Sequence, residues 1–226
     1  YNHIILALLI FIFSGTLFSS LVIFLDNSTF VTGNGLWLVK KTAKWADNSP
    51  DRELDNSKTF YLPATGLFAR WTPFDNDVKT ILKKTSIMNA LFGALALIFT
   101  FFLIYQLALT IGPSLLGIIF QSGCAFFLFL SIVPEDIMPA YAFFTGAVML
   151  AVMFARRRSF WLLFIFAQMY VISWLFHWSL IFAGPVFILA IILLPGPLRQ
   201  RLKEVFRFFY FCLPLPVAVA WLSTDI

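Results

Sequence analysis

Long apolar runs separated by short polar breaks dominate this chain. Runs of about 20 residues match the length of a helix that crosses a bilayer, and no strand-like alternation of apolar and polar residues is present. The first run, Ile4–Leu25, is too long for the apolar core of a signal peptide and predicts a retained membrane helix. Further spanning helices are predicted over 86–109, 114–133, 139–155 and 205–222.

The apolar run 160–194 is too long for one span and short for two. A bend near His177 and Trp178 would divide it into a hairpin of two short helices. The fold class expected is therefore an all-α membrane protein, a bundle of about seven transmembrane helices. Pro214 and Pro216 predict a kink in the last one, where neighbouring helices can satisfy the freed backbone groups.

The segment 26–84 is the stretch that is rich in charge. It contains two amphipathic pieces, 35–46 and 60–71, joined by a turn-rich connection. Amphipathic helices of this kind lie in the membrane interface, where tryptophan is enriched. We therefore predict two interfacial helices, with Trp37, Trp45 and Trp71 at headgroup depth.

Clusters of Lys and Arg in short loops predict the orientation of the bundle. Arg156–Arg158 form one such cluster, and Arg199, Arg201 and Lys203 form another on the same side if 160–194 is a hairpin. Both loops are then cytoplasmic. Counting helices back places the 26–84 loop and Glu135–Asp136 on the external, lumenal or periplasmic side. Both basic clusters could also hold anionic lipid phosphates.

Composition supports a single transmembrane domain over 1–226. The chain is 61% hydrophobic and 12% charged, whereas soluble domains are about 25% charged. The net charge of +5 is clustered, so no nucleic-acid partner is expected. Neither Cys124 nor Cys212 belongs to a disulfide framework or a metal spacing. Phosphate-loop, dinucleotide and zinc-protease motifs are absent from the sequence.

Two adjacent acids, Glu135 and Asp136, stand between apolar runs with a proline on each side. One interpretation makes them a base, a substrate ligand or a metal ligand at the mouth of the bundle. The other makes Asp136 a helix cap, with Glu135 favouring the positive N-terminal end of that helix. A cap needs only one acid, so we predict that one of them faces a cavity within reach of Asp26.

Two further polar residues are candidates. Asp26 directly follows the first helix and is either an ordinary interfacial acid or part of a site. His177 is either a substrate or haem contact or a polar residue that closes a short hairpin.

The order of these features resembles the membrane module of GT-C-fold glycosyltransferases, which use polyprenyl-phosphate sugars. The similar stretches are "FVTGNGLWLVKK" (30–41), "FYLPATGLFARW" (60–71), "NALFGALALIF" (89–99), "VPEDIMPAYAF" (133–143) and "WLFHW" (174–178). Together they extend over most of the chain.

The resemblance implies a function and a set of roles. Asp26 would be the catalytic base, and Glu135 and Asp136 would organise the acceptor, the phosphate or a divalent metal, the one candidate cofactor. Asn34 and His177 would bind substrate. The implied partners are membrane lipids and a lipid-linked sugar donor.

Two departures from the family keep a second function open. Many relatives carry an acid where this chain has Asn34, and an amide cannot act as a base. Full enzymes also continue with more helices, so the sequence is either incomplete or a catalytic module used alone. The alternative is a noncatalytic membrane subunit that acts as a scaffold for membrane-protein partners. A transporter ranks third, because helices up to 155 carry no mid-membrane charge.

Overall fold

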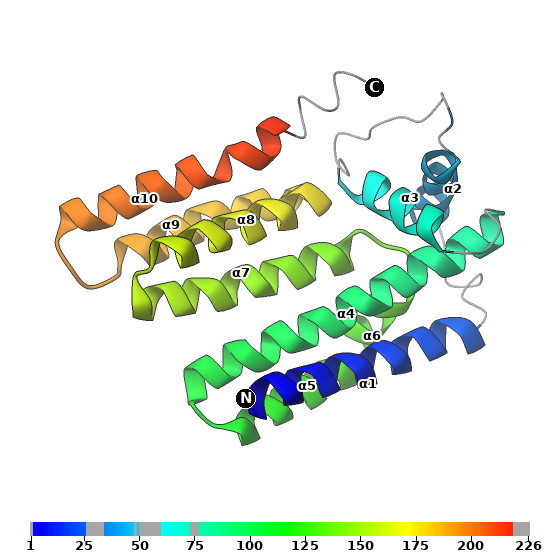
Figure 1. The fold of residues 1–226 in the computed structure, drawn as a ribbon, viewed down its shortest axis with the longest axis horizontal. Helices are drawn as coiled ribbons and strands as arrows, with labels where there is room; N and C mark the ends of the chain where they lie inside the picture. The colour runs from blue at the N-terminus through cyan, green and yellow to red at the C-terminus, as the bar shows by residue number, and fades with distance from the viewer. Residues whose placement is uncertain (1, 26–33, 48, 50–59, 73–76, 219–226) are drawn as a thin grey trace.

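The computed structural model describes residues 2–25, 34–47, 49, 60–72 and 77–218, and all regular elements within them are helical (Figure 1). The elements are α1 (Asn2–Phe24), α2 (Asn34–Ala46), α3 (Tyr61–Trp71), α4 (Val78–Ala108), α5 (Ile111–Gly123), α6 (Ala125–Ile132), α7 (Ile137–Arg157), α8 (Phe160–Phe176), the 3-10 helix η2 (Trp178–Ala183), α9 (Gly184–Ile192) and α10 (Leu198–Cys212).

The described helices make this an integral membrane protein by length and composition. Three of them, α1, α4 and α7, are long and apolar enough to cross a bilayer, and the bent pair α5–α6 would make a fourth span. The remaining apolar helices are shorter. The 17 residues of α8 rise about 26 Å, less than the hydrocarbon thickness of about 30 Å. The predicted count of about seven spans is therefore not reached by helix length.

Helix α4 is longer than the sequence pattern predicted. It begins at Val78 rather than 86, because the Asp77 side chain accepts a hydrogen bond from the Thr80 backbone N–H (3.2 Å) and caps the helix. Its 31 residues rise about 46 Å. That length exceeds a bilayer core, and α4 also contacts both α2 and α3.

The predicted single helix 114–133 is instead two helices. Cys124 has an extended backbone (φ −70°, ψ 119°), and α5 and α6 meet there at 68°. The preceding Gly123 weakens helix continuation. Helix α6 stops before Pro134 because a residue that precedes proline is disfavoured in the α conformation, and Val133 is extended (φ −109°, ψ 148°).

The predicted break in 160–194 is confirmed, and the last predicted helix is corrected. Helix α8 ends at Phe176, and His177 is extended (φ −142°, ψ 101°). Helix α10 begins at Leu198, not 205, and ends at Cys212. The chain bends at Leu213 and is helical again over 214–218, so the predicted interruption falls directly before Pro214. The basic residues predicted for a loop therefore lie within the first turns of α10.

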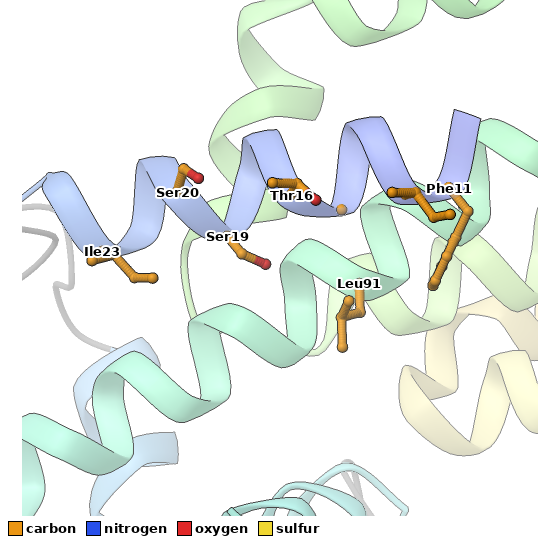
Figure 2. Close-up of a pocket in the computed structure, with 8 residues that line it drawn as sticks. Phe11, Thr16, Ser19, Ser20, Ile23 and Leu91 are labelled. Atoms are coloured by element: carbon orange, nitrogen blue, oxygen red, sulfur yellow. The ribbon is translucent and has the colours of Figure 1, made fainter. Parts of the chain in front are cut away.

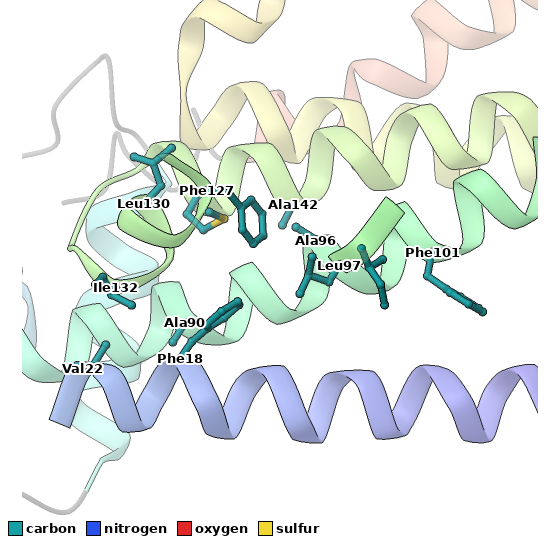
Figure 3. Close-up of a cluster of buried hydrophobic side chains, with 12 residues drawn as sticks. Phe18, Val22, Ala90, Ala96, Leu97, Phe101, Phe127, Leu130, Ile132 and Ala142 are labelled. Carbon is teal, nitrogen blue, oxygen red and sulfur yellow. The ribbon is translucent and has the colours of Figure 1, made fainter. Parts of the chain in front are cut away.

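Two of the four apolar clusters among the described residues join the long helices. Figure 3 shows the first, where side chains of α1, α4, α6 and α7 meet, including Phe18, Leu97 and Phe127. The second joins α7 to α8, α9 and α10. Ala147 is fully buried in that cluster and Ala151 packs against it, as expected where small side chains let membrane helices approach closely.

The connections are divided between the two ends of the bundle. Helices α2 and α3 lie at one end (Figure 1), where the Phe60 N–H donates to the Leu175 carbonyl (3.3 Å). We call this the α2–α3 end. The turn after α7 and the turn before α10 lie at the other end, where Arg158 donates to the Pro195 carbonyl (2.7 Å). We call this the basic end. Which membrane side each end faces stays a prediction.

Candidate functional site

Asp136 directly precedes α7, yet it does not cap that helix. Its backbone is α-like (φ −72°, ψ −13°) and its side chain makes no capping hydrogen bond. An N-cap side chain reaches the first turn from an extended backbone, which Asp136 lacks. Its Oδ2 instead lies 2.8 Å from Nδ1 of His177, and the residue is only 1% exposed. The helix-cap interpretation of Asp136 is therefore wrong.

His177 occupies the break between α8 and η2, and its side chain is 31% exposed. The extended backbone there frees the imidazole from the helix and turns Nδ1 toward Asp136. A carboxylate at Nδ1 fixes the ring orientation and leaves Nε2 to face a ligand. The two residues are 41 positions apart, so only the packing of α7 against α8 pairs them.

Asn89 on α4 holds the segment that carries the two acids. Its side-chain Nδ2 donates to the Val133 carbonyl (2.6 Å) and to the Glu135 carbonyl (2.7 Å). Asn89 is fully buried, and its two amide hydrogens replace the helical partners that these carbonyls lack. Sequence reasoning missed this role, although an amide in an otherwise apolar run was a usable signal.

Tyr61, the first residue of α3, is the second residue that sequence reasoning missed. It is fully buried, and its hydroxyl has no hydrogen-bond partner among the described residues. Burial raises the pKa of Tyr61 well above its ordinary value of 10.0, and the negative charges of Asp136 and Glu135 raise it further. The phenol therefore stays protonated beside both acids and is available as a hydrogen-bond donor.

Aromatic rings form an apolar wall around this group. The Phe176 ring stacks on Phe143 (5.6 Å, 10°) and meets Phe92 and Phe60 edge-on (5.8 and 5.3 Å). Excluding water from one side strengthens the electrostatic interactions at the acids. The arrangement is a water-poor acid–histidine site at the α2–α3 end of the bundle.

Helices α2 and α3 form a tightly packed pair next to the site. The hydroxyls of Thr42 and Thr65 lie 3.0 Å apart, and Arg70 donates to the Trp45 carbonyl (3.1 Å) at the C-terminal end of α2. Trp45 is 9% exposed, because the missing side chain of Gly66 lets it pack against α3. Trp71 is 79% exposed, and the headgroup depth of Trp45 and Trp71 stays a prediction.

The other predicted site residues are placed only in part. Glu135 is half-buried beside Asp136. Asn34 begins α2, but its side chain lies outside the described residues, as does all of Asp26. In the part of the chain that the structure describes, no three His, Cys, Asp or Glu side chains could hold a metal ion. The metal-ligand role of Glu135 and Asp136 stays a prediction, and no step below uses a metal.

Comparison of the chain with protein-family models, with curated proteins and with solved structures finds no match. The chemistry of the α2–α3 end is therefore the ground on which a function can be proposed.

Proposed function

We propose that this chain is a membrane glycosyltransferase of the GT-C type, which transfers a sugar from a polyprenyl-phosphate donor. The α2–α3 end would face the external or lumenal side, with α2 and α3 in the interface and the short helices α8 to α10 completing about seven membrane-embedded passes. The resemblance noted above supplies the reaction class. The site at the α2–α3 end supplies the groups that such a reaction needs.

The single observation that carries the proposal is the position of the Asp136 side chain. An ionised carboxylate in a nearly dry site costs several kcal/mol, and a capping role would have offset part of that cost. Asp136 instead contacts His177, in the break that follows α8, 2.8 Å away. Buried charged side chains that do not stabilise a helix terminus are characteristic of functional sites in membrane proteins.

The reaction assigns a role to each group. The acceptor hydroxyl attacks the anomeric carbon, its proton passes to a carboxylate, and the bond from that carbon to the lipid-phosphate oxygen breaks. His177, held by Asp136 at Nδ1, would donate from Nε2 to the departing phosphate. Asp26 would accept the proton, as the resemblance implies.

The test is an assay of the purified full chain in nanodiscs with polyprenyl-phosphate mannose, glucose and arabinose, following release of polyprenyl phosphate. Asp136→Asn and His177→Gln should each lower the rate about 100-fold or more, the range for loss of a positioned acid or base. Asp77→Asn is the matched control, because asparagine also caps a helix well. Full activity in both site variants, with thermal stability unchanged, would refute the proposal.

A second candidate, a noncatalytic subunit, is favoured by the outer face of α1. A groove of about 440 Å³ runs along α1 beside Leu91 (Figure 2), and small residues line it: Gly15, Thr16, Ser19 and Ser20. Small side chains let membrane helices approach closely, so this groove suits a helix of a partner protein. In that case, Ser19→Leu should shrink the native complex on a blue-native gel, Asp136→Asn should leave its size unchanged, and none of the donors should be turned over.

A further inference from the structure

The basic end of the bundle has more basic side chains than acidic partners among the described residues. Its one acid among the described residues, Glu204, is buried and paired with Arg158. Arg158 also donates to the Pro195 carbonyl (2.7 Å), and Arg201 donates to the Ile192 carbonyl (2.7 Å). Arg158, Arg201 and Glu204 therefore hold the two turns against α10.

The other basic side chains at this end have no acidic partner among the described residues. Arg199, Lys203 and Arg207 are all exposed, and their spacing of four residues places them on one face of α10. The Arg207 guanidinium lies 5.9 Å from the Phe160 ring at the start of α8. The exposed Arg156 and Arg157 end α7 nearby. We call Arg199, Lys203 and Arg207 the basic stripe.

An exposed apolar row runs along α10 beside the basic stripe. It contains Leu202 and Phe206, and Leu213 continues it directly after the helix; the three are 42%, 73% and 59% exposed. The third face of the helix is buried, with Val205, Phe208 and Phe211 in the core. Trp161 on neighbouring α8 is 67% exposed, as is common for tryptophan at headgroup depth. The helix therefore presents a positive surface and an apolar surface side by side.

We propose that the basic stripe binds the headgroups of anionic phospholipids, while the apolar row contacts their acyl chains. Long basic side chains can reach a headgroup from a helix whose adjacent face lies in hydrocarbon. A soluble acidic protein would match the charge but would leave the apolar row in water. Free phosphate would likewise match only the stripe. A phospholipid with a negative headgroup is the partner that matches both surfaces.

The experiment uses the full chain in an uncharged detergent, titrated with dioleoylphosphatidylglycerol or dioleoylphosphatidylcholine and followed by native mass spectrometry. Three basic residues near a negative surface strengthen binding by about 100-fold. The wild-type protein should therefore prefer phosphatidylglycerol at least about tenfold. The triple variant R199Q/K203Q/R207Q should lose that preference. The conservative R199K/R207K variant should keep it.

The matched control neutralises three exposed lysines at the α2–α3 end, Lys40, Lys79 and Lys83, and should leave the preference unchanged. Circular dichroism checks that each variant is folded. Equal binding of the two lipids by the wild type, an unchanged preference in the triple variant, or displacement of the lipid by equimolar inorganic phosphate would each overturn the proposal.

Discussion

Gly66 decides how closely α2 and α3 approach, so Gly66→Ala tests the packing next to the site. A Cβ at this position would lie 2.5 Å from Trp45 Cβ, 3.2 Å from the Trp45 carbonyl carbon and 3.4 Å from the Ala46 nitrogen. Two of these atoms are backbone, so no rotamer change relieves the clash and α2 must move. Overpacking of this kind costs about 1–3 kcal/mol, whereas alanine favours the helix by about 1 kcal/mol.

Gly123→Ala is the control, because a Cβ there meets nothing within 4 Å. The two variants should therefore differ by the overpacking cost, about 1–3 kcal/mol, with Gly66→Ala the less stable. For a chain of this length, that corresponds to a difference of roughly 2–12 °C in melting temperature. Thermal unfolding in detergent, followed by tryptophan fluorescence, measures it. If Gly66→Ala were as stable as Gly123→Ala, the close contact between α2 and α3 would be wrong.

Four further variants test individual contacts by the same thermal measurement. Glu204→Ala should lower the free energy of unfolding by about 3 kcal/mol, because it leaves Arg158 partly buried without its acid. The double variant R158Q/E204A should recover part of this loss. A loss equal to the sum of the two single losses would argue against the ion pair. Tyr61→Phe should raise stability by about 1 kcal/mol, since the buried hydroxyl has no partner among the described residues. Because the pKa of Tyr61 is raised in the folded protein, the unfolded state loses the phenol proton first, and wild-type stability should fall as the pH rises past 10.0. A Tyr61→Phe variant whose stability falls equally with pH in this range would contradict this. The hydrogen bond from Thr80 lowers the pKa of Asp77 below 3.8. The stabilisation by ionised Asp77 is therefore present above pH 3.8 and disappears as the pH falls through the pKa of Asp77 in the folded protein. Asp77→Asn should flatten the dependence of stability on pH in this acid range, and an unchanged dependence would exclude Asp77 as its source.

The sequence by itself determined the class of protein and much of its secondary structure. Apolar runs of bilayer length predicted the membrane helices α1, α4 and α7, and the amphipathic segments predicted α2 and α3. These elements follow from the local pattern because burial in lipid requires each helix to satisfy its own backbone hydrogen bonds. The break at His177 was also readable, since one span cannot hold the whole run 160–194.

The helix boundaries that the sequence missed depend on single contacts. Asp77 extends α4 by a capping bond to Thr80. The charged residues 199–203 were expected in a loop, but they form the start of α10, where Arg201 bonds to Ile192 and Arg158 pairs with Glu204. An average over hydrophobic periodicity does not contain such contacts.

The tertiary structure alone decided what Asp136 does. The local pattern fitted a helix cap equally well, because an acid before α7 suits the helix N-terminus. The packing of α7 against α8 brings His177 to Asp136, and the packing of α3 places Tyr61 beside the same acid. These partners lie 41 and 75 residues away along the chain, a separation at which sequence spacing carries no geometric information. Whether two polar side chains meet is fixed by how the helices pack, not by the pattern within either helix.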